Sequence, residues 1–314
     1  MNEPMTAKNK RQINIVLNQP AEKEKEKEES QLFQEKKLTE IEGHLPLVKI
    51  EKELNKLVGM DDFKYFVKEI YAWLYINKCR QEIGLKTEKQ ALHMMFKGNP
   101  GTGKTTVARL LGVLFHDMNV LSKGHLIEAE RADLVGEYIG HTAQKTRDLI
   151  KKASGGILFI DEAYSLGRGG EKDFGKEAVD TLVKAMEDQQ HSFILILAGY
   201  SQEMDRFLKL NPGLPSRFPL IMQFPDYTVD ELMEIGMRMV EEREYIMTKE
   251  CSWKLKQHLQ KVILEHGKSS FSNGRYVRNI VEKAIRRQSV RLLKELRHDK
   301  KTLMTLLSDD LLLD

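Results

Sequence analysis

The sequence predicts an α/β fold, a doubly wound parallel sheet, followed by a small all-helical domain. Between residues 91 and 224, short apolar runs alternate with stretches of helical spacing, as they do when crossover helices join parallel strands. A glycine-rich loop at residues 98–105 sits at the first strand-to-helix junction of this series. Beyond residue 226 only helical spacing remains. The expected parts are a charged arm at residues 1–43, an α/β domain at residues 44–226 and a helical domain at residues 227–314.

The composition is that of a globular protein without a dominant charge. Of the 314 residues, 41% are hydrophobic, which is enough for one large or two ordinary cores. Fifty basic and 47 acidic residues leave a net charge of +3, so there is no global electrostatic case for nucleic acid or a membrane surface. The two cysteines form neither a disulfide framework nor a metal cluster, and no apolar run approaches the roughly 20 residues of a membrane span. The N-terminus carries no hydrophobic signal segment, and we expect a cytoplasmic protein.

Residues 1–43 differ in character from the rest of the chain. The mixed-charge run at residues 22–29 cannot bury a core, so we expect this arm to be disordered or a solvated helix. An apolar island at residues 13–17 alternates as a strand or a docking peptide does. The arm is therefore either an unstructured tail or a tether that binds a partner.

The elements of the α/β domain follow in order. A first helix with one apolar face runs from a capping Asp61 to a terminating Gly84. The later strands are apolar runs, and the wholly apolar run at residues 157–160 suits the centre of a sheet covered on both faces. The predicted strands are residues 94–96, 125–129, 157–160, 192–198 and 219–224, and the predicted helices between them are residues 106–115, 142–154 and 176–188. The helical domain is expected to hold helices at residues 229–244, 253–265 and 275–296.

Residues 98–105 read Gly-Asn-Pro-Gly-Thr-Gly-Lys-Thr, the spacing G-x-x-x-x-G-K-[ST] of a phosphate-binding loop. Glycines let backbone N–H groups turn inward around an anion, Lys104 supplies a cation for the β- and γ-phosphates, and Thr105 offers a hydroxyl to Mg²⁺. The following helix directs its positive end at the same phosphates. The loop therefore predicts a bound nucleoside triphosphate. The loop positions expected to bind it are Asn99, Pro100, Gly101, Thr102, Gly103, Lys104, Thr105 and Thr106.

Two acidic residues, Asp161 and Glu162, end the apolar strand at residues 157–160. The carboxyl ends of parallel strands lie beside the ligand in such sheets. Asp161 is therefore expected to reach Mg²⁺, and Glu162 is expected to polarise the attacking water as a general base. This pair makes hydrolysis of the nucleotide the expected reaction.

Together, the phosphate-binding loop, the Ile-Asp-Glu-Ala segment at residues 160–163 and the following helical domain resemble the AAA+ ATPases. More narrowly, residues 134–142, 197–200, 211–218 and 224–227 are similar to the subfamily of the red-type Rubisco activases, which includes a sporulation member. The resemblance covers about residues 50–312. It implies ATP and Mg²⁺ as cofactors, hydrolysis of ATP to ADP and phosphate, a helical lid, and a homo-oligomer in the form of a hexameric ring.

The resemblance also implies roles for residues outside the two motifs. Val58 and Gly59 match the segment that contacts adenine. Arg217 matches the arginine finger, which stabilises transition-state charge in the neighbouring subunit's site, and Arg206 is the alternative. Arg275 matches the phosphate sensor of the lid, with Arg278 as its alternative. Lys104, Glu162 and Arg217 are thus the expected catalytic residues, and Thr105 and Asp161 are the expected metal ligands.

The family pattern also indicates where a client protein would bind and where this chain departs from it. Tyr138 and Ile139 match the pore loop of threading AAA+ proteins, although Tyr138 could instead pack against its own domain. The glycine-rich segment at residues 166–175 is either a second pore loop or a loop without function. The usual polar sensor after the fourth strand is absent, because Ala-Gly-Tyr stands at residues 198–200.

These observations favour an ATP-dependent motor that remodels an unknown client protein, with a role in sporulation implied by the resemblance. One alternative is a DNA-directed loader or helicase accessory, since the last predicted helix is rich in arginine and lysine. Those charges spread around the helix, however, so a solvated face is favoured and nucleic acid is not expected as a partner. The other alternative is a nucleotide-gated scaffold with little turnover.

Overall fold

The fold is described from a computed structural model that covers residues 45–87, 90–138, 140–168, 174–210, 213–266, 271–295 and 299–313. Its centre is a five-stranded sheet with the strand order β2-β3-β4-β1-β5, and all neighbouring strands run parallel. The strands are β1 (Met94–Gly98), β2 (Leu126–Ala129), β3 (Ile157–Ile160), β4 (Ile194–Gly199) and β5 (Leu220–Phe224). Each of the five predicted strands is present, so the parallel sheet is confirmed.

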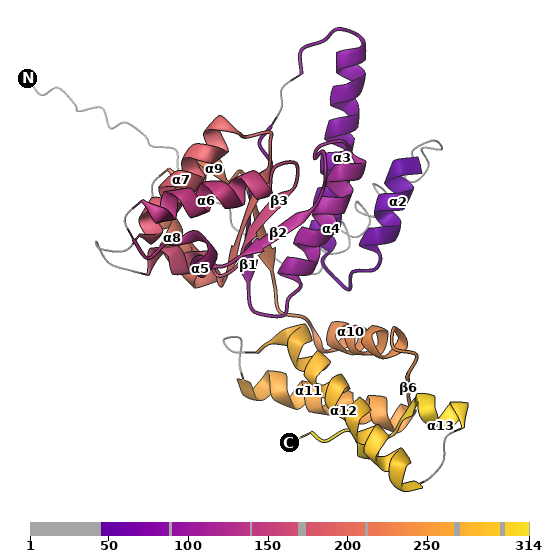
Figure 1. The fold of residues 1–314 in the computed structure, drawn as a ribbon. Helices are drawn as coiled ribbons and strands as arrows, with labels where there is room; N and C mark the ends of the chain where they lie inside the picture. Colours follow the sequence, from indigo (N-terminus) through magenta and orange to yellow (C-terminus); the bar gives the residue numbers. More distant parts are fainter. Residues whose placement is uncertain are drawn as a thin grey trace, which may run out of the picture. The chain divides into compact units, whose positions relative to one another are not determined.

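Helices cover both faces of this sheet (Figure 1). One layer contains α2 (Leu45–Leu54), α3 (Asp61–Glu82) and α4 (Lys104–Asp117). The other contains α5 (Arg131–Leu134), α6 (His141–Lys152), the 3₁₀ helix η1 (Ala163–Gly167), α7 (Gly175–Asp188), α8 (Ser201–Leu210) and α9 (Leu214–Arg217). Met94 and Phe96 of β1 belong to the core under the first layer, whereas Met95 between them belongs to the core under the second. This alternation along a buried strand confirms the doubly wound arrangement.

The predicted first helix, α3, ends as expected but begins differently. Gly84 has a φ of 78°, and the N–H groups of Gly84 and Leu85 donate to the carbonyl oxygens of Gln81 and Arg80 at 3.0 and 2.9 Å. This is the pair of bonds by which a left-handed glycine ends a helix. Asp61, expected to cap the helix, is its first residue, because the preceding Met60 takes the cap position with a φ of 59°.

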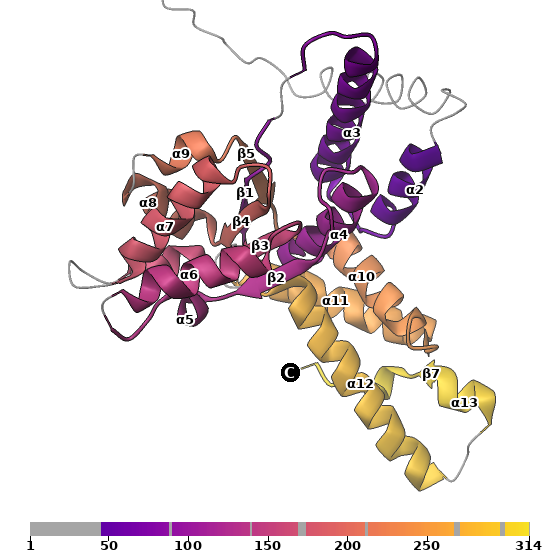
Figure 2. The same ribbon diagram turned by 45° about the horizontal axis from the view of Figure 1, so that its top comes forward.

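A separate helical domain follows β5. It consists of α10 (Val229–Glu241), α11 (Lys249–His266), α12 (Asn273–Glu295), α13 (Lys300–Met304) and the 3₁₀ helix η3 (Ser308–Asp310). The long helices α10, α11 and α12 lie together (Figure 2) and enclose a third core, which includes Leu232, Leu255 and Val277. Thr228 starts α10 with a capping box, in which its hydroxyl accepts from the N–H of Glu231 at 3.3 Å. The helical character of this domain is confirmed.

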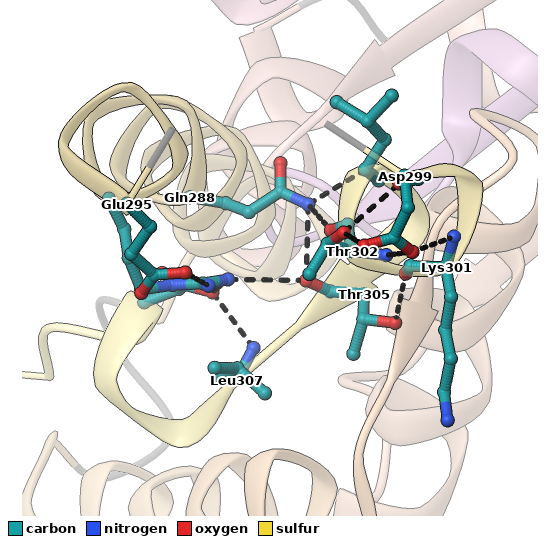
Figure 3. A network of polar contacts seen from close by, with 10 residues as sticks. Gln288, Glu295, Asp299, Lys301, Thr302, Thr305 and Leu307 are labelled. Atoms are coloured by element: carbon teal, nitrogen blue, oxygen red, sulfur yellow. Dashed lines mark hydrogen bonds and ion pairs between the residues drawn. The ribbon is translucent and has the colours of Figure 1, made fainter. Parts of the chain in front are cut away.

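The helical domain also contains a short parallel pair that the sequence does not predict, formed by β6 (Ile246–Met247) and β7 (Thr305–Leu306). Gln288 of α12 is only 2% exposed and donates from Nε2 to three carbonyl oxygens between residues 302 and 305, at 2.8 to 3.1 Å. Figure 3 shows this amide pointing toward Thr302 and Thr305, where α13 ends and β7 begins. One buried side chain thus pairs carbonyl groups at the C-terminal end of α13 and the first carbonyl of β7.

No helix within the described ranges is both long and apolar enough to cross a lipid bilayer. The predicted charged arm at residues 1–43 lies outside the described residues, as do Ile139 and residues 169–173 of the glycine-rich segment.

Candidate functional site

The loop between β1 and α4 turns at two glycines with left-handed backbone. Gly101 has a φ of 72° and Gly103 a φ of 92°, a region that residues with a side chain rarely adopt. Gly103 is the N-cap of α4, and Lys104 is the first residue of that helix. Thr102 closes the loop by donating from Oγ1 to the carbonyl oxygen of Asn99 at 2.8 Å. The loop therefore leads directly into a helix N-terminus, the combination that binds phosphate.

The Lys104 ammonium is held over this loop. Its Nζ donates to the carbonyl oxygens of Gly98 and Asn99 at 2.9 and 2.8 Å. Burial lowers the pKa of Lys104 below its ordinary value, an effect that nearby Asp161 opposes and nearby Arg275 adds to. A phosphate placed here would supply the negative charge that stabilises the buried cation.

Asp161 and Glu162 directly follow β3, at the same edge of the sheet where β1 ends. The Oδ1 atom of Asp161 accepts from the N–H of Glu162 at 2.9 Å. Glu162 has a φ of 46°, a strained value for a residue with a side chain. Both acids line one cleft together with Lys104 and Thr105. The structure therefore brings the two predicted halves of the site together.

This cleft has a volume of about 610 Å³ and is lined by both domains. The predicted binding residues that line it are Val58, Pro100, Gly101, Gly103, Lys104, Thr105, Thr106, Asp161, Glu162 and Arg275. Three other predicted residues, Gly59, Asn99 and Thr102, are adjacent in sequence to lining residues but do not line it themselves.

Part of the cleft lining is apolar. Leu57, Val58 and Met60 line it from the segment before α3, and Ile235 and Met239 line it from α10. Such a slot suits the flat face of a nucleobase, with the charged end of the ligand at Lys104. Sequence reasoning missed the contribution of α10, because its apolar residues repeat with ordinary helical spacing.

Arginines of the lid approach the same cleft. Arg275 and Arg278 of α12 both line it, so the structure places both candidates for the phosphate sensor close to the site. Arg238 of α10 also lines it and donates to the carbonyl oxygens of Lys56 and Asn55 at 2.5 and 3.4 Å. Arg238 thus attaches the lid to the segment that carries Val58.

The candidate arginine fingers lie elsewhere. Arg217 ends α9, where Nη1 donates to the carbonyl oxygen of Gly213 at 2.5 Å and Nη2 forms an ion pair with Glu187 of α7. Arg206 is an exposed residue of α8. Neither side chain lines the cleft, which is the arrangement expected of a residue that serves another subunit's site.

Tyr138, the predicted pore-loop aromatic, is 66% exposed. Its ring meets the ring of His141 edge-on, with 5.5 Å between the centroids. The predicted partner Ile139 falls outside the described residues, so the structure places only the tyrosine. Tyr138 is thus available to a ligand rather than buried in its own domain.

Two tyrosines occupy the region where the usual polar sensor is missing. A side chain at Gly199 would collide with the ring of Tyr164, whose Cδ1 atom lies 2.7 Å from the position of a β-carbon. Tyr164 and Tyr200 pack with 5.9 Å between their ring centroids, and Tyr200 lines the cleft. Burial, assisted by the nearby Glu162 carboxylate, raises the pKa of Tyr164 to about 12. The glycine at the end of β4 therefore admits an aromatic ring beside Glu162.

Comparison with known proteins identifies the family. The model of the ATPase family associated with various cellular activities (AAA) matches residues 94–226, and that of the AAA lid domain matches residues 228–314. Stage V sporulation protein K of Bacillus subtilis is 64% identical over 307 residues, which cover 98% of this chain and 95% of the relative. The chain belongs to the AAA family of ATPases. It is therefore an enzyme that binds and hydrolyses ATP.

Other relatives of this AAA ATPase confirm the narrower resemblance. The chloroplastic ribulose bisphosphate carboxylase/oxygenase activase of Cyanidioschyzon merolae is 45% identical over 238 residues, covering 76% of this chain and 80% of the relative. Among solved structures, a mutant of the RuvB protein of Thermotoga maritima matches with a TM-score of 0.51 and 19% identity, covering 82% of this chain and 68% of that one. At that identity the RuvB likeness shows the fold alone.

The donors in the AAA site fit a Mg²⁺ ion that is shared with a nucleotide. Mg²⁺ in phosphate-transfer sites is held by one or two protein oxygens, with phosphates and water completing its coordination. The Thr105 hydroxyl and the Asp161 carboxylate are oxygen donors of this kind in the same cleft. In the described part of the chain, no group of three or more His, Cys, Asp or Glu side chains is placed to hold a metal ion.

Proposed function

We propose that this AAA ATPase is a protein-remodelling motor that works as a hexameric ring and hydrolyses ATP at the interfaces between subunits. The observation that carries the proposal is the cleft in which Lys104, Thr105, Asp161 and Glu162 meet the lid residue Arg275. A site lined by both domains can convert the state of the nucleotide into a change of the lid angle.

Within the cleft, the proposed division of work follows from charge and position. Lys104 and the loop amides hold the β- and γ-phosphates, and Thr105 and Asp161 hold Mg²⁺, which neutralises charge on the phosphates when bound. Glu162 orients a water molecule toward the γ-phosphate and accepts its proton. Arg275 reaches the γ-phosphate from the lid.

Arg217 is proposed to complete the site of a neighbouring subunit. Its guanidinium lies outside the cleft of its own chain, on α9 just before β5. An arginine delivered from a neighbour stabilises the charge that develops on the transferred phosphoryl group. Hydrolysis would then require neighbouring subunits, as a ring provides. Arg206 remains the alternative finger.

Tyr138 is proposed to engage the client polypeptide. Its exposed ring offers a flat apolar surface that grips a chain without regard to its sequence. The 64% identity to stage V sporulation protein K supports a role in sporulation.

The deciding experiment is Glu162→Gln, with Glu250→Gln on the exposed start of α11 as the matched control. Removing the general base should lower ATP turnover by roughly 10²- to 10⁴-fold while ATP is still bound. Phosphate release and equilibrium binding of ATP would be measured over a range of protein concentrations. Normal turnover in Glu162→Gln would refute the catalytic assignment, and wild-type turnover that stayed low and independent of protein concentration would favour the nucleotide-gated scaffold.

A further inference from the structure

A single carboxylate connects the phosphate-binding loop to the lid. Asp226 lies in the segment between β5 and α10. It accepts from the side-chain amide of Asn99 in the loop, with its two oxygens 2.9 and 3.0 Å from Nδ2. It also accepts from Nδ2 of Asn273, the first residue of α12, at 2.7 Å. These contacts bridge positions that are 127 and 47 residues away along the chain.

Asn273 is held tightly in this arrangement. It is fully buried, and it has a φ of 47°, which is costly for a residue with a side chain. Its Oδ1 accepts from the N–H of Tyr227 at 3.0 Å, and its Nδ2 also donates to the carbonyl oxygen of Phe271 at 3.1 Å. Both ends of the amide are therefore used, and the surrounding contacts maintain a strained start to α12.

The backbone of the lid touches the backbone of the loop at the same place. The N–H of Gly274 donates to the carbonyl oxygen of Gly101 at 3.1 Å. A β-carbon on Gly101 would lie 2.1 Å from the carbonyl oxygen of Ser272, so only glycine permits this approach. Tyr227 adds a hydrogen bond from its hydroxyl to the carbonyl oxygen of Thr102 at 3.2 Å. A movement of the loop around a phosphate would therefore displace residues 272–274 directly.

We propose that Asp226 is a positioning residue that fixes the start of α12, and with it Arg275, against the phosphate-binding loop. Arg275 lines the cleft two residues after Asn273, so its reach toward a γ-phosphate depends on where α12 begins. This role rests on the proposed function of Arg275 as the phosphate sensor. It makes Asp226 a determinant of how well the site distinguishes ATP from ADP.

The test is Asp226→Asn in the full-length protein, with Asp230→Asn as the matched control. The amide of an asparagine at position 226 keeps the volume of the carboxylate, but it presents a donor to Asn99 or to Asn273, which are donors themselves. Asp230 lies on α10 with an 83% exposed side chain and pairs with Lys256 at the surface. Calorimetric titrations would use ADP and the non-hydrolysable ATP analogue adenylyl imidodiphosphate, both with Mg²⁺.

We expect Asp226→Asn to weaken binding of the ATP analogue by about tenfold, the size of effect expected when hydrogen bonds to a charged group are lost, and to change ADP binding by less than about twofold. Combined with Arg275→Ala, it should cause no further loss beyond that of Arg275→Ala alone, because the two residues act through one contact. Asn273→Gly provides a second variant, since glycine accepts the positive φ while removing the amide. It should reproduce the selective loss even if Asp226→Asn does not fold.

Three outcomes would overturn the inference. If Asp226→Asn weakened the binding of both nucleotides equally, Asp226 would have a general structural role. If the losses of affinity in Asp226→Asn and Arg275→Ala were additive, Asp226 would not act through Arg275. Tighter binding of both nucleotides would show that Asp226 acts only through its negative charge. Removing a negative charge near Lys104 favours the binding of any anion. If wild type and Asp230→Asn bound neither nucleotide, the proposed function itself would fail.

Discussion

His93, immediately before β1, gives a pH dependence that the structure allows to be worked out. It is 1% exposed, and its ring packs against Phe193 with 5.6 Å between the centroids. Its Nδ1 accepts from the N–H of Leu195 at 3.0 Å. Burial lowers the pKa of His93 to about 4; a hydrogen bond with the backbone of Met186 opposes this shift, and a positive charge on the nearby His191 adds to it.

The sign follows from linkage. In the unfolded chain the pKa of a histidine is about 6.5, so the unfolded state takes up a proton first as the pH falls. The contribution of neutral His93 to the free energy of unfolding is complete above pH 6.5 and is lost progressively between pH 6.5 and about 4. At pH 5 the loss amounts to about 2 kcal/mol relative to pH 8.

The perturbation is His93→Asn, whose Oδ1 can accept from the N–H of Leu195 but does not titrate. Urea unfolding at pH 8 and pH 5 would be followed by tryptophan fluorescence in a Trp253→Phe background. Of the chain's two tryptophans, that leaves Trp73 of α3 to report on the α/β domain. We expect wild type to lose about 2 kcal/mol more than His93→Asn between the two pH values.

The matched control is His116→Asn, because His116 is an exposed histidine at the end of α4. It should lose as much stability as wild type does over the same pH range. Equal losses in wild type and His93→Asn would show that the His93 ring is charged in the fold or can be solvated there, and the reasoning from burial would be wrong.

Two further predictions concern assembly and the client. Arg217→Ala should still bind ATP but lose roughly 10³-fold or more of its assembly-dependent turnover, measured as phosphate release at high protein concentration. If Arg206→Ala showed that loss and Arg217→Ala did not, the finger would be Arg206. Tyr138→Ala should abolish the stimulation of ATP turnover by an unfolded polypeptide such as reduced carboxymethylated lactalbumin, and Tyr138→Phe should restore it because the aromatic ring is sufficient. Stimulation that survived in Tyr138→Ala would refute the pore-loop role.

The sheet was predictable because its buried strands consist mainly of apolar residues in the sequence. The four residues Ile157–Ile160 are all apolar, and they form β3 with the predicted bounds. Short elements have no such pattern of apolar residues. A two-residue strand such as β6 has no periodicity, and its partner strand β7 is bound at Thr305 by the distant side chain of Gln288. The sequence therefore indicates elements whose own apolar residues are buried. It does not indicate short elements that are bound by a side chain distant in the sequence.

The same distinction applies to the site. The phosphate-binding loop and the Asp161–Glu162 pair could be predicted because phosphate and Mg²⁺ require particular residue types at particular spacings. Arg275 of the lid was expected from the family resemblance, but the contacts that join the lid to the loop could not be predicted. The contact of Asn99 with Asp226 spans 127 residues, and an Asn or Asp before a helix usually indicates only a cap. The motif position of Asn99 suggests contact with the nucleotide, whereas the structure directs its side chain to Asp226.

The ion pair between Arg217 and Glu187 indicates how assembly could control the proposed finger. The two side chains are 27% and 56% exposed, and ion pairs at such positions contribute only about 0–1 kcal/mol. The buried Nε of Arg217 has no hydrogen-bond partner in the described structure. A neighbouring subunit's phosphate offers more charge and more acceptors than Glu187 does, so the exchange would be favourable once the subunits meet. The ion pair with Glu187 can thus orient the Arg217 side chain in the single chain without preventing its transfer to a neighbouring site.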